Sequence, residues 1–592
     1  MNIIIRYQKL LISLLLLLAI TIVKADEVRQ YNCNYTIEEI EIDGVINDNA
    51  WKNANWTEEF VDITGNDSLK PFQRTKVKML WDDNYMYLAA FMEEDNVWAT
   101  LKNRDDIIYR DNDFEIFIDP DGDALNYYEY EVNALGTIMD LFMQKPYNKG
   151  GKANLKWNFE GIKSAVKVYR SLNNPKDDDV FWSVEVAIPW EAFSQDKKPK
   201  IGNEWRINFS RVEWHTDVVE GKYVKKKDES GKTLAEENWV WSPQGKIDMH
   251  LPEMWGKVRF VKEASNRKIP TYWIWMHAYS NWDLNKWKLA FERLNKAQIK
   301  GILVSANAEV LNKIIPLAGF YDIQVHAWMW TMNRGDAKPE WLSVNALGKS
   351  LAEEKAYVNY YKFMCPALPE VREFLKNKVE ELVKIKGLSG IHFDYIRYVD
   401  VILPKELQPN YGLVQNHIMP EYDYGYHPYL RKIFKNKYGT DPLDLKNYAE
   451  NKQWLDFRLK VLDTTVWALR DVINQYNLLS SAAVFPSPEM SRKMVRQGWD
   501  KWKLDIYFPM IYHNFYGKKV KWIKKIVKED VKEMGKASLV YAGLYLPALK
   551  DIKDFKRAIK AAKEGGAAGV SLFDYNSLSD EMIKVMGKIV WP

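Results

Sequence analysis

The sequence predicts a two-domain protein in which an antiparallel β-sandwich is followed by a (β/α)8 barrel, also called a TIM barrel. Short segments of alternating polar and apolar residues fill the first half. From about Ile269, buried-type strands alternate with amphipathic helices, and eight such strands can be counted. A chain of 592 residues is long enough for two or three core-sized units.

The first 25 residues have the pattern of a secretory signal peptide. Arg6 and Lys9 precede an apolar run over residues 10–23, which ends in Val23-Lys24-Ala25. No comparable apolar run follows, so we expect no membrane span. The expected domains are residues 26–262 and 263–592, in a protein exported to the periplasm or to the outside of the cell.

Composition excludes some classes of partner. The formal net charge is +4 with acids and bases interspersed, so no nucleic-acid footprint is expected. The two cysteines, Cys33 and Cys365, are too few for a disulfide framework or a metal site, and a single bridge between them stays open. The 25 Trp and 34 Tyr suit stacking on sugar faces as well as core packing.

Five segments of the first half alternate as strands do, and turn sequences such as Asp82-Asp83-Asn84 separate them. The segments are residues 36–42, 76–81, 85–91, 114–119 and 181–189. Their spacing predicts an antiparallel β-sandwich.

This half resembles the family 9-like carbohydrate-binding modules. The resemblance rests on residues 43–51, 81–87, 111–123, 131–134, 186–190 and 205–211. It implies a sugar held between two aromatic rings, with Tyr109 as one ring and Trp241 or Trp239 as the other. Glu131 stands where such modules carry an arginine. A scaffold that binds no sugar is therefore the alternative.

Asp119, Asp121 and Asp123 alternate as Ca²⁺ ligands can, although the fixed spacing of an EF-hand is missing. A Ca²⁺ site and a solvated turn are both open here. No other cofactor is expected.

The eight strands of the second half are expected at residues 272–277, 301–305, 323–330, 390–398, 479–485, 504–512, 538–546 and 568–575. Helical stretches lie between them, among them residues 285–297, 370–384, 454–474 and 552–564. Eight strand–helix pairs close a barrel, and the surplus length falls after strands three and four.

The strand at residues 390–398 contains the most informative carboxylate. Alternation places His392 and Asp394 on one face, which in a barrel is the interior, with Asp394 at the C-terminal rim. Arg397 is expected to lower the pKa of Asp394 and to keep it charged. The alternative is a purely structural ion pair between the two residues.

The second half resembles the glycosyl hydrolase-like family 10 barrels, also called family 10-like glycosidases. The matching residues are 325–328, 366–372, 390–398, 425–428, 438–442, 457–458 and 569–576. The resemblance implies a glycoside-cleaving barrel.

Glycosidic cleavage needs two carboxyl groups, one ionised and one protonated. Asp394 is the candidate nucleophile or base. Asp574 and Glu489 are the leading candidates for the acid, because apolar residues flank both in the sequence. Further acid candidates just beyond strand ends are Glu309, Glu421 and Asp423.

Further candidates for substrate binding lie in or just past the strands. They are His277, His326, Trp328, His392, Arg397, Tyr398, Tyr512 and His513. The histidines lack the short spacing of a zinc motif, so we expect no metal there. No phosphate loop or Gly-x-Ser-x-Gly elbow is found.

The sequence thus predicts a secreted glycoside hydrolase that acts on a polysaccharide or oligosaccharide. The alternative is a glycan-binding protein with an inert barrel. The sugar, the linkage, the stereochemical outcome and the oligomeric state stay open.

Overall fold

The computed structural model describes residues 28–193, 198–262, 268–279 and 281–591. The predicted signal peptide lies outside the described residues. The chain divides into two compact units, one up to residue 266 and one from residue 267. No helix among the described residues is both long and apolar enough to span a membrane.

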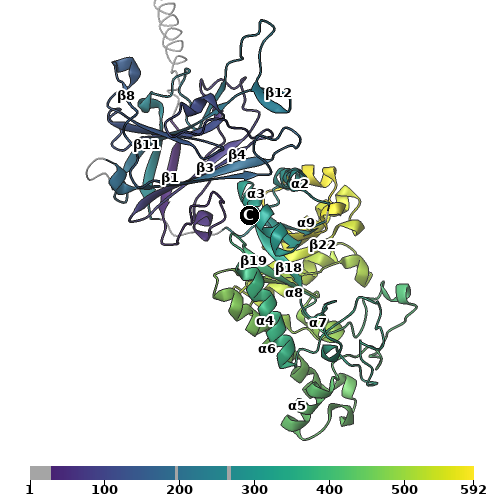
Figure 1. Ribbon diagram of the computed structural model, residues 1–592. Helices are drawn as coiled ribbons and strands as arrows, with labels where there is room; N and C mark the ends of the chain where they lie inside the picture. The colour runs from purple at the N-terminus through teal and green to yellow at the C-terminus, as the bar shows by residue number, and fades with distance from the viewer. Residues whose placement is uncertain (1–27, 194–197, 263–267, 280, 592) are drawn as a thin grey trace, which may run out of the picture. The chain divides into compact units, whose positions relative to one another are not determined.

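The first unit is rich in β-strands (Figure 1). Its strands are β1 (Gln30–Tyr35), β2 (Val61–Asp62), β3 (Thr75–Trp81), β4 (Tyr85–Glu93), β5 (Asp113–Asp119), β6 (Tyr127–Asn133), β7 (Ile138–Met143), β8 (Ala153–Asn154), β9 (Lys163–Tyr169), β10 (Phe181–Pro189), β11 (Glu204–Glu213), β12 (Thr216–Val219), β13 (Lys222–Lys225), β14 (Glu237–Val240) and β15 (Gly256–Val261). All except β12 and β13, which form a separate hairpin, belong to one continuous sheet of 13 strands.

The antiparallel sandwich prediction is confirmed only in part. Most neighbours are antiparallel, but β1 pairs in parallel with both β15 and β3. Side chains from β4 and β10 and from β5 and β6 share one buried core, so the single sheet curves around it. The prediction of a strand at residues 36–42 is wrong, because β1 ends at Tyr35 and the segment after it has no regular structure.

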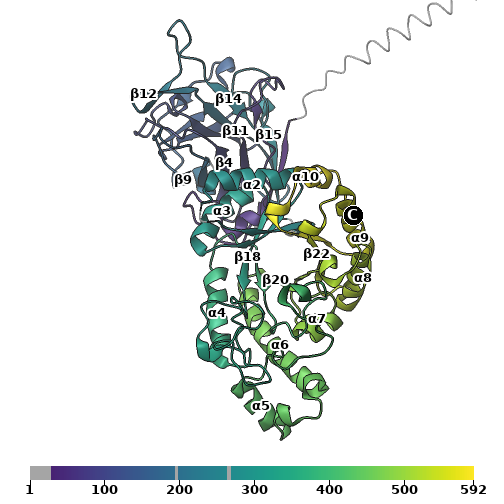
Figure 2. The ribbon, with the colours of Figure 1, turned by 90° about the vertical axis from the view of Figure 1, so that its right-hand side faces the viewer.

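The second unit is a closed parallel barrel of eight strands (Figure 2). The strands are β16 (Tyr272–His277), β17 (Gly301–Ser305), β18 (Gln324–Trp330), β19 (Gly390–Asp394), β20 (Leu479–Val484), β21 (Ile506–Pro509), β22 (Leu539–Tyr545) and β23 (Gly569–Phe573). A strand lies in each of the eight predicted ranges, although β19 ends at Asp394 and β21 is shorter than predicted, and the ring closes where β23 pairs with β16. The predicted barrel is therefore present.

Helices follow the strands and surround the barrel in Figure 2. They are α2 (Leu284–Lys296), α3 (Ala308–Phe320), α4 (Pro369–Val383), α5 (Pro428–Tyr438), α6 (Lys452–Asn474), α7 (Pro488–Val495), α8 (Trp522–Met534), α9 (Ile552–Gly565) and α10 (Asp580–Met586). Several begin at side chains that accept a hydrogen bond from the first helical turn, namely Asp283, Asn307 and Asp551. These three N-caps fix the residue at which α2, α3 and α9 begin.

The barrel interior is filled mainly by aromatic side chains. Trp273, Trp275, Leu303, Phe508 and Tyr541 pack together in one buried cluster. A filled interior leaves the C-terminal ends of the strands as the place where side chains reach solvent.

Cys33 and Cys365 are each buried and free. Burial raises the pKa of both thiols. The disulfide between them, which the sequence left undecided, is not formed in this structure.

Candidate active site

Asp394 ends β19 at the rim of the barrel, and two N–H groups fix its carboxyl group. Trp328 Nε1 donates to Oδ2 at 3.1 Å, and the Tyr395 backbone N–H donates to Oδ1 at 2.7 Å. The second bond depends on a turn, because Tyr395 has a φ of 50°, in the left-handed region that non-glycine residues rarely adopt. The carboxyl group therefore has a single defined orientation.

Burial raises the pKa of Asp394 to about 6, against the two N–H donors and the charge of Arg397, which all lower it. The expectation of a lowered pKa is thus wrong. Arg397 donates instead to Asp400 at 3.0 Å and to the carbonyl of Tyr398. The turn at Tyr395 redirects the chain, so closeness in sequence did not produce an ion pair with Asp394.

Asp574 follows β23 and is partly exposed. Ser577 Oγ donates to its Oδ1 at 2.9 Å. Burial lowers the pKa of His277, and the negative charge of Asp574 opposes that effect. The His277 ring lies 4.7 Å from the Trp328 ring, and Trp328 is the hydrogen-bond donor to Asp394.

The pKa of the Tyr512 hydroxyl depends on both carboxyl groups. Burial raises the pKa of its hydroxyl, and the charges of Asp394 and Asp574 both raise it further. The ring of Tyr512 lies 6.1 Å from that of Phe573, the residue before Asp574. Asp394, Trp328, His277, Asp574 and Tyr512 therefore form one group at the C-terminal end of the barrel, which we call the rim cluster.

The other acid candidates have different surroundings. Glu489 is exposed in the first turn of α7, so it lacks the apolar environment that the sequence led us to expect. Glu309 is exposed on α3, and its pairing with Lys313 lowers its pKa. Asp423 is fully buried against Arg458 Nη1 at 2.8 Å, so it is part of the packing. Glu421 is half-buried in the loop after β19, and its backbone carbonyl accepts a hydrogen bond from Asn345 Nδ2.

Two predicted substrate-binding histidines are core residues instead. His326 and His392 are fully buried, and each Nδ1 lies 3.0 Å from the hydroxyl of Ser481. A Cβ atom at Gly390 would lie 2.6 Å from His326 Nε2, so glycine is needed there. Alternation put His392 on the interior face correctly, but one layer below the rim.

Tyr398 and His513 also lie elsewhere. Tyr398 is buried, and its hydroxyl donates to the carbonyl of Arg458 at 3.1 Å. His513 is buried in the turn after β21, where burial lowers its pKa and the charge of Asp554 raises it.

Aromatic side chains that our sequence analysis did not single out lie beside the rim cluster. Tyr545, at the end of β22, is 5.3 Å from Tyr512. Tyr360, from the loop after β18, is half-exposed and lies 6.0 Å from Trp330. The sequence signal was available, since both are tyrosines at or beyond a strand end.

In the first unit, only one of the expected sugar-binding rings is at the surface. Tyr109 is 43% exposed, but Trp241 is fully buried and donates to Glu58 at 2.9 Å. Trp239 is buried too, so neither tryptophan can be the second ring. Trp214 is the aromatic side chain that reaches Tyr109, through a 2.9 Å hydrogen bond from its Nε1 to the Tyr109 carbonyl.

Comparisons with known proteins agree with the class of the first unit. Residues 42–261 match the family model described as carbohydrate family 9 binding domain-like. The first unit is therefore similar to this family of domains, as the sequence resemblance implied.

Two curated relatives share a short stretch with this chain. Endo-1,4-beta-xylanase A of Thermoanaerobacterium saccharolyticum is 27% identical over 167 residues, which is 28% of this chain and 12% of the relative. Exoglucanase XynX of Acetivibrio thermocellus is 26% identical over 167 residues, which is 28% of this chain and 13% of the relative. The matches thus span only about an eighth of the length of these relatives.

Among solved structures, the chain is similar to a family 9 carbohydrate-binding module from Caldicellulosiruptor kristjanssonii in complex with glucose. The match has 18% identity and a TM-score of 0.27, and it covers 40% of this chain and 98% of that one. The chain is also similar to the PgaB (BpsB) glycoside hydrolase domain from Bordetella bronchiseptica. That match has 12% identity and a TM-score of 0.42, and it covers 53% of this chain and 98% of that one.

Proposed function

We propose that the barrel hydrolyses glycosidic bonds in a polysaccharide and that Asp394 and Asp574 are its two carboxyl groups. The observation that carries the proposal is the position of the two carboxyl groups, since Asp394 ends β19 and Asp574 follows β23 at the C-terminal end of a closed barrel. Barrel enzymes carry their chemistry at this end. Paired carboxyl groups across a cleft are what glycosidic cleavage requires.

In this proposal the roles of the two carboxyl groups follow from their surroundings. With a pKa of about 6, Asp394 is protonated in about one molecule in ten at pH 7, which suits a group that gives and takes a proton. Asp394 is thus the acid that protonates the leaving oxygen, and the partly exposed Asp574 is the base or nucleophile. This reverses the role expected for Asp394 from the sequence.

The substrate class is supported by the first unit. A carbohydrate-binding domain in the same chain would keep the barrel on an insoluble or long glycan. Tyr360, Tyr545, Trp330 and Tyr395 supply aromatic faces near the rim cluster on which sugar rings can stack. The signal-peptide pattern of residues 1–25 supports export, so the glycan would be met outside the cytoplasm.

The test is a screen of the purified full chain against plant, host and peptidoglycan glycans, with detection of new reducing ends. Asp394→Asn and Asp574→Asn should each abolish product formation while the melting temperature stays near that of the wild type. Glu489→Gln, at an exposed carboxylate, should keep most of the activity. Full activity in either aspartate variant would overturn the assignment of that residue.

The alternative function, a glycan-binding protein with an inert barrel, is favoured by the match of the first unit alone. It predicts retention on a glycan array with no product from any glycan that binds. The same screen therefore separates the two functions.

A further inference from the structure

Four carboxylates gather on one face of neighbouring strands in the first unit. Asp113 and Glu115 are on β5, and Glu129 and Glu131 are on β6. Glu115 is directly opposite Glu131 in the antiparallel register, and alternation places the other two on the same face. All four are at most 5% exposed. Like charges directly opposite each other in a sheet are destabilising, so this arrangement needs a compensating partner.

Three of the four carboxylates have no basic partner among the described residues. Among the described residues, Asp113, Glu115 and Glu131 form no ion pair with any Lys, Arg or His. His250 Nε2 lies 3.7 Å from Glu129, and the neighbouring Arg211 pairs with Glu94 and Glu213 instead. Burial raises the pKa of Asp113, Glu115 and Glu131, and each feels the charge of other carboxylates in the group.

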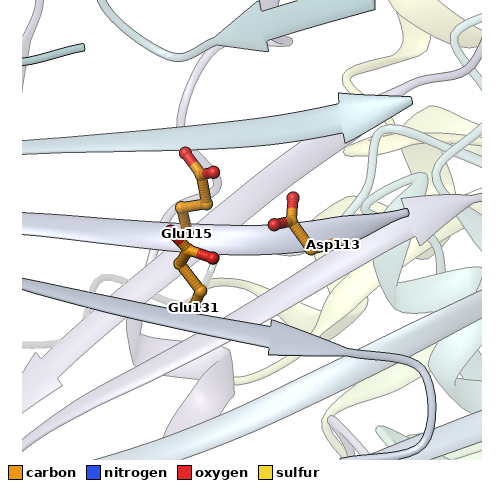
Figure 3. A group of neighbouring side chains, drawn as sticks. All are labelled: Asp113, Glu115 and Glu131. Carbon is orange, nitrogen blue, oxygen red and sulfur yellow. The ribbon is translucent and has the colours of Figure 1, made fainter. Parts of the chain in front are cut away.

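Two carboxylate oxygens of the group accept no hydrogen bond from the described residues, namely Glu129 Oε2, which lies 3.7 Å from His250 Nε2, and Asp113 Oδ2. Asp113 is fully buried, and its Oδ1 accepts the Val212 N–H at 3.1 Å. Its Oδ2 is buried and accepts no hydrogen bond from the described residues. In Figure 3 the Asp113 carboxyl group is turned along β5 toward Glu115 and Glu131. A buried carboxylate oxygen without a donor is costly, and a bound cation would remove that cost.

The spacing of the oxygens fits one ion. One carboxylate oxygen from each of Asp113, Glu115 and Glu131 lies within 4.8 Å of the other two. Oxygens bound to Ca²⁺ at 2.3–2.6 Å can be up to about 5 Å apart, whereas the shorter bonds of Mg²⁺ limit the separation to about 4 Å. Carboxylates are hard ligands that suit these ions rather than zinc or copper.

We propose that Asp113, Glu115 and Glu131 bind a hard divalent cation, for which Ca²⁺ is the best fit. We call this group the sheet carboxylate site. The ion neutralises the facing carboxylates of β5 and β6 and gives Asp113 Oδ2 a partner. Glu129 lies beside the site and adds negative charge to it.

The site is connected to the exposed aromatic surface. The Tyr109 backbone N–H donates to Glu131 Oε2 at 3.2 Å, and Trp214 donates to the Tyr109 carbonyl. An ion that fixes Glu131 therefore also holds the backbone of Tyr109.

The second acidic group of the unit differs and provides a control. Asp119 accepts the N–H groups of Gly122 and Ala124, one on each carboxylate oxygen, and Asp121 and Asp123 are exposed. That pattern is typical of a solvated turn. We therefore place no ion there.

The first experiment titrates the EDTA-treated, dialysed full chain with CaCl₂, MgCl₂ and MnCl₂ by calorimetry. We expect one Ca²⁺ bound per chain and weaker binding of Mg²⁺. At a hundredfold excess over its Kd, Ca²⁺ should raise the melting temperature of the first unit by about 5–10 °C. Failure of all three cations to bind would overturn the proposal.

The second experiment assigns the ion to its residues. Glu131→Gln and Asp113→Asn preserve side-chain size and should each abolish the calorimetric signal and the Ca²⁺-dependent rise in melting temperature. Without Ca²⁺ the Glu131→Gln protein should melt at the wild-type temperature or above it, because one buried like charge is removed. Asp123→Asn should bind as the wild type does. Normal binding by Glu131→Gln together with loss in Asp123→Asn would place the ion in the turn and overturn the proposal.

Discussion

The buried carboxylates of the barrel rim and those of the sheet carboxylate site have different partners. In the barrel, Asp400 pairs with Arg397, Asp423 pairs with Arg458, and each oxygen of Asp394 accepts one N–H group. In the first unit, Asp113, Glu115 and Glu131 face one another without a basic partner among the described residues. A buried charge needs a compensating partner, and in the sheet carboxylate site Asp113 Oδ2 accepts no hydrogen bond from the described residues.

Asp394 in the rim cluster is an intermediate case, because its carboxyl group accepts two N–H groups but forms no ion pair with a cation of the described residues. That is why burial outweighs them and its pKa is raised. A carboxyl group held in one orientation, but not neutralised, is suited to proton transfer.

The largest expected effect is on catalysis. Asp394→Asn removes the proton donor and should lower kcat by about a thousandfold or more, measured as reducing ends released from any glycan that the wild type cleaves. A loss of less than tenfold would contradict the role of Asp394 and would leave it as a structural residue.

The next effect is on stability in the barrel. Arg458→Met leaves the buried Asp423 without its closest partner and should lower the free energy of unfolding by about 3–5 kcal/mol, measured by urea denaturation. Arg431→Met, which breaks a partly exposed pair with Asp441, is the matched control and should cost less than about 1 kcal/mol. If the two variants lose the same free energy of unfolding, Arg496, 3.6 Å from Asp423, is enough to compensate the Asp423 charge without Arg458.

A smaller effect is expected on glycan binding by the first unit. Tyr109→Ala removes the exposed ring and should weaken affinity about tenfold, which is about 1.4 kcal/mol, measured by calorimetry with a glycan that the wild type binds. Trp241→Phe should lower the melting temperature and leave affinity unchanged, because Trp241 is buried. Unchanged affinity in Tyr109→Ala would support the scaffold alternative.

The smallest effect concerns the pH profile. As the acid, Asp394 must be protonated, so activity should fall as pH rises through about 6. Trp328→Phe removes an N–H donor that favours the charged form, so the alkaline limb should move up by about half to one pH unit. If activity instead rises as the pH increases through 6, Asp394 is the base.

The same group has a linked effect on folding. The folded pKa of Asp394 lies above its usual value near 3.8, so its contribution to stability is complete below about pH 4 and is lost as pH rises through 6. The Asp394→Asn protein should therefore lose less stability than the wild type between pH 4 and pH 7.

Secondary structure in the barrel followed from local pattern, because buried strands and amphipathic helices have different periods. Alternation also gave the direction of His392 and Asp394. Alternation did not show how deep in the barrel each side chain lies. His392 is in the core beside Ser481, two residues before the rim. Residues 36–42 alternate as a strand does but lie outside any strand, since alternation cannot say whether a neighbouring strand is available.

The sequence by itself determined the eight-stranded barrel, the β-rich first unit and the place of Asp394 and Asp574 at strand ends, because these depend on short-range periodicity. Only the tertiary structure decided the partners: Arg397 with Asp400, Trp328 with Asp394, and Glu115 with Glu131 across two strands. Charge and burial act through space over a few ångströms, so a pKa or a cation site depends on contacts between residues distant in the chain.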